Sequence, residues 1–232
     1  MAYALNSERV LLIGGGDGLA LREVLHYNSV QEVTVVDIDP AMTQLASRMP
    51  VLKRLNANAF ADPRVEAIHA DAWAWLQRHG DLYDVILIDL PDPSTETLAR
   101  LYTEAFYQRV ARRLSVGGVM ATQATSPWFA HKAFWSIGHT IEQVFNDVKP
   151  LQTYVPSFGP WGFFMATQHP MDGVVHSIYS GRYISSGQLP AILSLPVDQQ
   201  RIDVDVNRSG SLALLGYYRE GWSFINEGKA SP

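Results

Sequence analysis

The stretch that decides the fold is "VLLIGGGDGLALREVL", from Val10 to Leu25. An apolar run typical of a buried strand ends in a glycine cluster, and a segment with apolar residues on roughly one helical face follows at once. Gly14, Gly16 and Gly18 lack the Cβ atom that would keep a sharply turning backbone away from a ligand. The free N–H groups at the start of the helix would point at the same place. The stretch therefore predicts a strand, a turn and a helix that bind a nucleotide or a nucleoside.

The same alternation of strand and helix patterns continues through the first two-thirds of the 232 residues. Each strand-like run is rich in Val, Ile and Leu, as strands covered on both faces must be. Seven such runs separated by helical segments predict a doubly wound α/β sheet whose strands are mostly parallel. The predicted strands are residues 9–13, 32–37, 65–69, 83–89, 119–123, 148–154 and 161–167.

Three helices carry clear signals of their own. The first covers residues 17–27, and the second runs from residue 97 to a stop at the adjacent glycines 117 and 118. The third begins at Ser126 with Pro127 in its first turn, and its aromatic residues are expected in the core. These aromatic residues are Phe129, Phe134, Trp135 and Phe145.

From about Pro170 the pattern weakens, because Gly, Ser and Pro are scattered through the sequence. We therefore expect a Rossmann-like nucleoside-binding domain over residues 1–169 and a C-terminal extension over 170–232 that packs on it. Residues 212–224 are apolar enough to dock on the sheet domain rather than hang free. Residues 226–232 are expected to be disordered.

The composition is that of a globular protein with a substantial core, since 47% of the residues are hydrophobic and 18% are charged. The net charge of -5 argues against a general binder of nucleic acid, which would carry a basic face. There is no cysteine, so thiolate chemistry is excluded and a reducing, cytoplasmic location fits.

The chain has neither an apolar run of roughly 18 residues nor a secretory signal, so we expect no membrane contact by it. The histidines lack metal-ligand spacing, and no metal is expected.

Aspartates follow the ends of the first four predicted strands. Asp17 follows the first strand, Asp37 ends the second and Asp71 follows the third. Asp89 ends the fourth strand, and Asp92 lies three residues later. The carboxyl ends of the strands form the ligand crevice of an open α/β sheet, so these five side chains are expected to converge on one site. An acid at the end of the second strand can take both hydroxyls of a ribose.

The acids also have structural interpretations. Asp17 serves equally well as a helix N-cap, Asp71 can cap the helix that follows it, and Asp92 before a proline can shape a turn. Asp39, next to a proline, is assigned to capping alone. Asp84, near the start of the fourth strand, is expected to be a solvated or turn-forming acid. A shared site explains the five strand-end positions better than five separate coincidences.

Carboxylates that lie close together repel one another and raise one another's pKa unless cations compensate. A sulfonium nucleoside with a free amine, together with a diamine, has the charge that such a cluster needs. A carboxylate is also a suitable base for removing a proton from an attacking ammonium group. Pro91 and Pro93 would stiffen the loop that holds the last two acids.

Several motifs occur in one order between about residues 9 and 167. They are "LLIGGGDG", "LREVL", "VTVVDIDP", "DPRVEAIHADAWAWL", "YDVILIDLPDP", "LYTEAFYQRVARRLSVGGVMATQATSPWF" and "PSFGPWGF". Together they resemble the polyamine aminopropyltransferases, the spermidine synthase family. The chain is most similar to the bacterial subgroup whose synthase-like domain follows a set of membrane helices. The resemblance implies the Rossmann-like sheet of the S-adenosylmethionine-dependent methyltransferase type.

The resemblance also implies an activity, the transfer of the aminopropyl group of decarboxylated S-adenosylmethionine to putrescine or a similar amine, with release of methylthioadenosine. Asp37 would hold the ribose of this co-substrate, and Asp71 with Ala72 would hold its adenine. The three glycines would line the nucleoside. No tightly bound cofactor is implied. The expected partners are the sulfonium nucleoside and the amine, and a homodimer is left open.

The amine-handling residues follow from the same resemblance. Asp17 would bind the aminopropyl amine of the co-substrate. Asp89 would act as the base that frees the amine of putrescine, and Asp92 would help to bind that amine substrate. Tyr154 is a further candidate for substrate binding.

The chain departs from the family pattern in three places. The family has two small hydroxyl residues between its loop acids, where this chain has Leu90 and Pro91. The family's substrate tyrosine aligns with Pro156, and Tyr154 lies two residues earlier. The N-terminal β-hairpin domain of the family is absent, because the chain starts at the first Rossmann strand. We therefore expect a fragment of a longer protein whose missing part includes the hairpin, and transmembrane helices that hold the parent in the inner membrane are left open.

Other functions share part of this pattern. An S-adenosylmethionine-dependent methyltransferase has the same fold, but it must accept a cofactor carboxylate that Asp17, Asp89 and Asp92 would repel. A non-catalytic domain that binds a nucleoside or a polyamine is a second alternative. A nicotinamide dehydrogenase would use a similar glycine cluster, yet no hydride-transfer residues are evident. The acceptor amine and the activity of this chain without a hairpin are left open.

Overall fold

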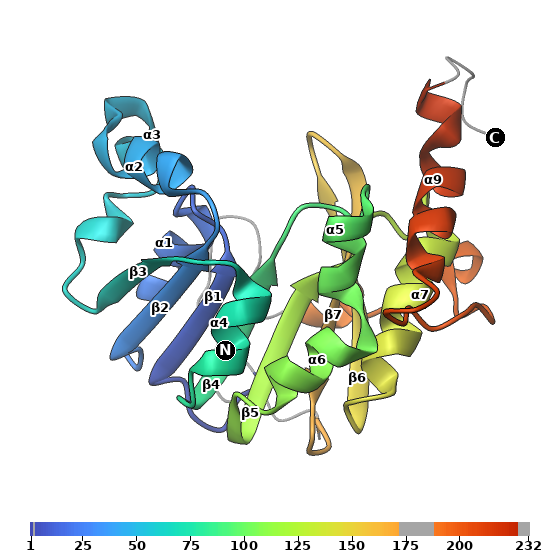
Figure 1. Cartoon of the computed structure of the whole chain (residues 1–232), viewed down its shortest axis with the longest axis horizontal. Coiled ribbons are helices and arrows are strands. Elements are labelled where there is room, and N and C mark those ends of the chain that lie inside the picture. Colours follow the sequence, from blue (N-terminus) through green and yellow to red (C-terminus); the bar gives the residue numbers. More distant parts are fainter. Residues whose placement is uncertain (2, 172–187, 227–232) are drawn as a thin grey trace. The chain divides into compact units, whose positions relative to one another are not determined.

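The computed structural model of the chain describes residues 1, 3–171 and 188–226, and Figure 1 shows the order of its helices and strands. Within these residues, one seven-stranded sheet has the strand order β3-β2-β1-β4-β5-β7-β6. The strands are β1 (Arg9–Gly14), β2 (Glu32–Asp37), β3 (Val65–His69), β4 (Tyr83–Asp89), β5 (Leu114–Gln123), β6 (Asp147–Val155) and β7 (Gly159–Thr167).

Most of the helices are short. None of those in the described part of the chain is long and apolar enough to cross a membrane. The α-helices are α1 (Leu19–Leu25), α2 (Pro40–Arg48), α3 (Pro50–Leu55), α4 (Ala72–Arg78), α5 (Glu96–Ala99), α6 (Glu104–Ala111), α7 (His131–Glu142), α8 (Leu189–Ile192) and α9 (Ala213–Asn226). Single 3-10 turns form η1 (Ala59–Ala61), η2 (Arg100–Tyr102) and η4 (Val197–Gln199).

The predicted α/β sheet is confirmed. β1 pairs in parallel with β2 and with β4, and β2 pairs in parallel with β3. β6 and β7 pair antiparallel, from Asp147 opposite Thr167 to Val155 opposite Gly159. β2, β3 and β4 have the predicted bounds, and β1 is one residue longer than predicted. The valines and leucines of β1 and β2 are buried as predicted, whereas the edge strand β3 is largely exposed.

The chain forms two compact units. The first comprises the described residues of Met1–Leu90, Arg112–Ala121 and Met171–Ser186. The second comprises those of Pro91–Ala111, Thr122–Pro170 and Gly187–Pro232. The apolar core of the first unit joins β1, β2 and β4 to α1, and it includes Val10, Leu12, Leu21, Val24, Val33, Val35 and Val85.

The prediction of one long helix over residues 97–118 is wrong. The chain forms α5, η2 and α6 instead, with a break at Thr103, whose backbone is extended. Asn207, which is fully buried, stabilises this break from the C-terminal part of the chain. Its side-chain amide donates to the Ala99 carbonyl at 2.9 Å, and its own carbonyl accepts the Glu104 N–H at 3.1 Å. A distant residue therefore supplies hydrogen bonds that a continuous helix would have made internally.

The adjacent glycines that predicted the end of this helix lie inside β5. Gly117 has a φ of +78°, and a Cβ there would lie 2.5 Å from the side chain of Leu5. The start of β5 is held by Asp84, which was expected to be only a solvated or turn-forming acid. Its carboxylate accepts the Ser115 hydroxyl at 2.7 Å and the backbone N–H of Arg9 at 3.1 Å. These bonds explain why the strand begins five residues earlier than predicted.

The third predicted helix begins later than expected. α7 starts at His131, and the residues before it form a turn. Ser126 organises this turn, because its hydroxyl oxygen accepts the N–H groups of Trp128 and Phe129 and donates to the Pro160 carbonyl at 2.7 Å. The expectation of core aromatics is confirmed for Phe134, Trp135 and Phe145, which are all buried. Phe129 is only half-buried.

The predicted apolar segment over 212–224 forms most of α9, which packs against α7. Leu214 and Leu215 of this helix are buried. Asn226, which was expected to be disordered, is the last residue of α9. The rest of the expected disordered end, 227–232, lies outside the described residues, as do residues 172–187 of the extension.

Two glycines in helices of the second unit allow a matched test of packing. Gly138 in α7 lies against Phe164 of β7, and a Cβ at this position would be 2.5 Å from the Phe164 Cζ atom. Gly216 in α9 is exposed and has open space around its Cβ position. We expect Gly138→Ala to lower the free energy of unfolding by about 1–3 kcal/mol because of the clash. We expect Gly216→Ala to raise it by about 0.5–1 kcal/mol, since alanine loses less backbone entropy.

Urea unfolding of both variants measures the two effects. A Gly138→Ala variant as stable as the unchanged protein would contradict the close packing of α7 on β7. Equal effects of both substitutions would show that helix propensity alone governs these positions.

Candidate functional site

The glycine loop meets the end of β4 in the first unit. The parallel register of β1 and β4 places Gly14 opposite Asp89. Gly14 has a φ of +83°, and a Cβ at this position would collide with the carbonyl oxygen of Asp89. Only glycine combines this backbone conformation with such a close approach. The predicted reason for a glycine at position 14, a sharp turn, is therefore correct, but the contact that excludes a side chain comes from the neighbouring strand.

Gly16 and Asp37 form the second part of the loop. The Gly16 N–H donates to Asp37 Oδ2 at 2.8 Å, and a Cβ on Gly16 would lie 2.6 Å from the same oxygen. The other oxygen, Oδ1, accepts the Asp39 N–H at 2.8 Å. Asp39 caps α2 through the Ala41 N–H, as predicted. The half-buried carboxylate of Asp37 is thus held against the loop at the end of β2, where its remaining lone pairs can accept further donors.

Gly18 and Asp17 begin α1. Gly18 is the N-cap residue in the left-handed conformation, and the side chains of Phe60 and Asn56 surround its Cβ position. The carboxylate of Asp17 accepts the N–H of Leu19 at 2.9 Å from one residue before the N-cap, so Asp17 supports the helix start, but the prediction that it is itself the N-cap is wrong. Asn56, which the sequence reasoning did not single out, is fully buried and donates to the Asp17 carbonyl at 3.0 Å.

Asp89 lies with two further negative charges. Its Oδ2 atom is 3.7 Å from the Cβ position of Gly15 in the loop, and the residue is exposed to solvent. Its pKa is raised, first because the surrounding chain partly removes the carboxyl group from water and second because of the charges of Asp17 and Asp37. In the described residues, no arginine or lysine forms an ion pair with any of these three acids. The structure therefore brings together the predicted carboxylates at the ends of β1, β2 and β4.

Asp71 takes the capping position that the sequence allowed. It is the N-cap of α4, and its Oδ1 atom accepts the Ala74 N–H at 2.8 Å. The residue is exposed, and Ala72, the first residue of α4, is buried. A binding role for these two residues stays a prediction.

Asp92 belongs to the second unit, and its side chain does not shape the turn after it. Its Oδ1 atom accepts the Gln123 amide at 3.2 Å, and its Oδ2 atom accepts the Thr125 hydroxyl at 3.0 Å. The turn uses only its backbone carbonyl, which accepts the Ser94 N–H. Burial raises the pKa of Asp92, and hydrogen bonds from Thr125, Gln123 and Tyr218 act in the opposite direction.

Gln123 and Thr125 were missed by the sequence reasoning. Gln123 ends β5, so its place at a strand terminus was a usable signal. Its amide also donates to the hydroxyl of Tyr102, which in turn donates to the Pro91 carbonyl at 2.9 Å. The chain of hydrogen bonds fixes both the carboxylate of Asp92 and the loop before it. Thr125 carried no comparable signal.

The remaining candidate, Tyr154, is exposed on β6, opposite Pro160 of β7. Its role in substrate binding stays a prediction. Nearby in the sequence, Phe158 and Trp161 have ring centroids 5.0 Å apart.

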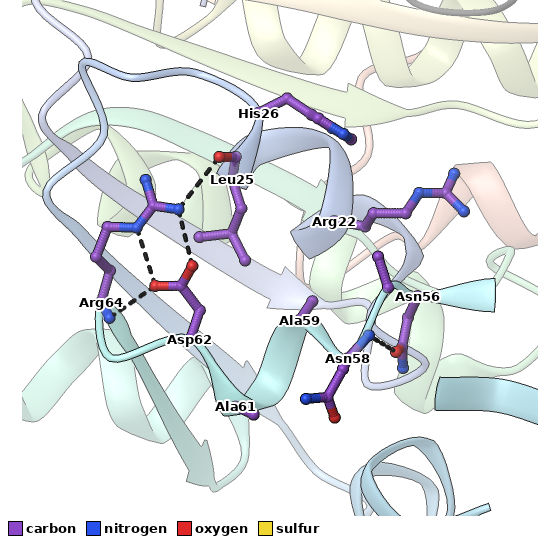
Figure 2. A pocket seen from close by; sticks show the side chains of 10 residues that line it. Arg22, Leu25, His26, Asn56, Asn58, Ala59, Ala61, Asp62 and Arg64 are labelled. Atoms are coloured by element: carbon purple, nitrogen blue, oxygen red, sulfur yellow. Dashed lines mark hydrogen bonds and ion pairs between the residues drawn. The ribbon is translucent and has the colours of Figure 1, made fainter. Parts of the chain in front are cut away.

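A separate pocket of about 370 Å³ lies in the first unit beside α1 and η1, and Figure 2 shows the residues that line it. Its arginines are committed to internal partners. Arg64 donates to Asp62 at 2.8 Å and to the Leu25 carbonyl at 3.2 Å, and Arg22 donates to the Leu55 carbonyl. None of the predicted site residues lines this pocket. Over residues 1, 3–171 and 188–226, no three His, Cys, Asp or Glu side chains are arranged to hold a metal ion.

The chain is similar to known proteins over most of its length. Residues 1–176 match the model of the family described as "Spermine/spermidine synthase domain". The chain is 40% identical over 218 residues to a polyamine aminopropyltransferase of Leptospira interrogans, with 94% of this chain and 44% of the relative covered. It is 42% identical over 216 residues to polyamine aminopropyltransferase 1 of Streptomyces coelicolor, with 92% and 41% covered.

Solved structures give the same result. Spermidine synthase from Thermotoga maritima matches with a TM-score of 0.75 and 27% identity, over 84% of this chain and 67% of that one. A spermidine synthase in complex with the transition-state analogue AdoDATO matches with a TM-score of 0.76 and 27% identity, over 84% and 68%. The chain spans less than half the length of the two curated relatives named above. By the match of its first 176 residues and by these relatives, the chain belongs to the spermine/spermidine synthase domain family.

Proposed function

We propose that this chain carries a polyamine aminopropyltransferase activity. The aminopropyl group of decarboxylated S-adenosylmethionine would be transferred to putrescine or a similar amine, and methylthioadenosine would be released. The observation that carries the proposal is the cluster of Asp17, Asp37 and Asp89 around the glycine loop, which no described cation neutralises. A positively charged nucleoside and a positively charged amine supply the charge that this cluster lacks.

The nucleoside is proposed to bind to the first unit. Asp37 would accept the ribose hydroxyls with the lone pairs that Gly16 and Asp39 leave open. Asp71 would accept the adenine amino group, because only one of its oxygens is needed to cap α4. Ala72 would lie against the same base. Asp17 would bind the ammonium group of the aminopropyl chain.

The transfer itself needs a base and a fixed geometry. Asp89, whose pKa is raised, would remove a proton from the ammonium group of the acceptor. The freed lone pair would form a C–N bond to the aminopropyl carbon next to the sulfonium while the C–S bond breaks. Methylthioadenosine would leave as a neutral thioether, and the proton would pass from Asp89 to water. Since the leaving group is already activated, alignment and electrostatics would provide most of the rate.

The rival methyltransferase activity requires a cofactor with a carboxylate, and the acid cluster would repel it. The similarity to a spermidine synthase that binds AdoDATO also favours aminopropyl transfer. We further propose a cytoplasmic location, which the absence of cysteine from the sequence fits. A homodimer, a parent with transmembrane helices and the binding role of Tyr154 are proposals that rest on the family resemblance alone.

Product analysis with two sulfonium donors tests the proposed activity. The chain is incubated with putrescine and either decarboxylated S-adenosylmethionine or S-adenosylmethionine. We expect aminopropylated amine and methylthioadenosine from the first donor only. Methyl transfer from the second donor without aminopropyl transfer from the first would overturn the proposal. Binding of both ligands without any transfer would favour the non-catalytic alternative.

Two substitutions separate binding from chemistry. Asp37→Ala should weaken methylthioadenosine binding by roughly 10-fold or more, because hydrogen bonds to a charged group are lost. Asp89→Asn should lower kcat by roughly 100- to 1,000-fold, as loss of a general base does, and leave methylthioadenosine affinity nearly unchanged. Calorimetry and steady-state kinetics measure these effects. Unchanged nucleoside affinity in Asp37→Ala would rule out the ribose assignment.

The raised pKa of Asp89 also predicts an effect on stability. A carboxyl group whose pKa is higher in the folded state than in the unfolded state makes the fold less stable once pH rises above its folded pKa. Asp89→Asn should therefore raise the free energy of unfolding at pH 7, and the gain should be small because solvent screens the exposed carboxyl group. The gain should disappear below about pH 4, where aspartate is protonated in both states.

Denaturant unfolding at several pH values measures this gain. Glu66→Gln, on the exposed strand β3 of the same unit, is the control and should have little effect at either pH. A loss of stability in Asp89→Asn at pH 7 would contradict the assignment of an electrostatically unfavourable carboxylate.

A further inference from the structure

The C-terminal helix α9 is joined to the carboxylate of Asp92 by hydrogen bonds. The indole N–H of Trp222 donates to the Thr125 hydroxyl oxygen at 3.3 Å, and that hydroxyl donates to Asp92 Oδ2 at 3.0 Å. Tyr218, one helical turn before Trp222, also interacts with Asp92, since its hydroxyl lowers the pKa of that carboxyl group. All four residues belong to the second unit. Two polar groups of one helix face are therefore used to orient one carboxylate.

Thr125 occupies a costly backbone conformation between α9 and Asp92. Its φ is +59°, a region that β-branched residues rarely adopt, and it is fully buried. Such a conformation costs on the order of 1–3 kcal/mol and persists only where the surroundings hold it firmly. Here the Thr125 N–H donates to Gln123 Oε1 at 3.0 Å, and its carbonyl accepts the Gly162 N–H at 2.7 Å. Backbone strain of this kind is concentrated at functional sites.

Aromatic rings surround Trp222, which is joined to this carboxylate through Thr125. The ring of Trp222 lies 5.5 Å from Phe129, 6.3 Å from Trp161 and 6.2 Å from Tyr218, measured between centroids. Tyr218 and Trp222 are both half-buried, so part of each ring faces solvent. An organic ammonium group is attracted both by a carboxylate and by aromatic faces. The combination suits one end of a diamine better than it suits a neutral ligand.

Other contacts besides these two polar groups hold α9 in place. Leu214 and Leu215 are buried, and Gly221 lies so close to Ala130 that a Cβ would be 2.6 Å from its Cα atom. Lys132 of α7 also pairs with Glu220 of α9 at 2.7 Å. The Tyr218 hydroxyl and the Trp222 N–H are instead directed at the Asp92 network. Burial and the charge of Asp92 raise the pKa of Tyr218 to about 12, so its hydroxyl stays protonated and able to donate.

We propose that Tyr218 and Trp222 are positioning residues for the amine substrate, which fix the Asp92 carboxylate so that it receives an ammonium group of that substrate. This inference rests on the proposed aminopropyl transfer and assigns part of its amine selectivity to α9. Tyr218 acts directly on Asp92, and Trp222 acts through Thr125. The C-terminal extension thereby contributes to recognition of the acceptor and not only to stability.

The test compares two ligands in variants that keep an aromatic ring. Tyr218→Phe removes one hydroxyl and Trp222→Phe removes the indole N–H. Tyr217→Phe is the matched control, because the Tyr217 hydroxyl on the same helix donates to Asp205 at 3.0 Å instead. Calorimetry measures the affinity for putrescine in the presence of saturating methylthioadenosine, and separately the affinity for methylthioadenosine alone.

We expect putrescine binding to weaken about 5- to 20-fold in Tyr218→Phe and about 3- to 10-fold in Trp222→Phe, as for lost hydrogen bonds near a charged group. Methylthioadenosine affinity should stay unchanged in both, and Tyr217→Phe should change neither affinity. Thr125→Ala and Thr125→Ser form a second pair. The serine variant, which keeps the hydroxyl, should bind putrescine better than the alanine variant.

Unchanged putrescine affinity in both α9 variants would overturn the inference. An equal loss of affinity for both ligands would also overturn it, since that result marks a general structural defect. Transfer by the unmodified chain decides the proposed function separately. If that chain binds putrescine but transfers no aminopropyl group, the proposed function fails while the affinities still decide the role of α9. If it binds no putrescine, the inference itself is wrong.

Discussion

The parallel register that places β1 between β2 and β4 is the constraint on which the rest of the site depends. It sets Gly14 opposite Asp89 and brings the two backbones so close that no side chain fits on the glycine. The following turn then presents the Gly16 N–H to Asp37 at the end of β2. A shift of one residue in either pair would turn the buried faces outward and would separate the loop from both acids. Strand pairing, and not the loop by itself, therefore builds the carboxylate cluster.

The cluster has an energetic consequence that links structure to function. Backbone N–H groups at Gly16, Leu19 and Asp39 stabilise the carboxylates of Asp37 and Asp17. The N–H dipoles carry no net charge, so the negative charges of Asp17 and Asp37 remain. These charges contribute to the raised pKa of Asp89. A fold under selection for stability alone gains nothing from such an arrangement, whereas a site for cationic ligands requires it. The membership of the chain in the spermine/spermidine synthase domain family is consistent with this requirement.

Asp89 at the end of β4 and Asp92 in the loop after it have different surroundings. Partial burial and like charges raise the pKa of Asp89. Within the described residues, no hydrogen bond to its carboxyl group opposes this rise. Burial also raises the pKa of Asp92, but Thr125, Gln123 and Tyr218 act in the opposite direction. Hydrogen bonds from Gln123 and Thr125 fix the orientation of its carboxylate. A carboxylate of the first kind readily takes a proton, and one of the second kind holds a positive charge in a defined place. Gln123 and Thr125, supported by α9, make the difference.

The sequence by itself determined the sheet and most of the acids that follow its strands. Strand patterns are local and periodic, so β2, β3 and β4 could be predicted to the residue. The glycine loop and its acids could be predicted because the carboxyl ends of parallel strands share one edge. The resemblance to the polyamine aminopropyltransferases then supplied the roles.

Only the tertiary structure decided features that depend on residues distant in the chain. Asn207 breaks the expected long helix from about a hundred positions away, and Asp84 extends β5 by bonding to Ser115. The recruitment of Tyr218 and Trp222 to Asp92 is of the same kind. No local pattern encodes such pairings, because each is set by which side chains the packed sheet and helices bring within hydrogen-bond distance.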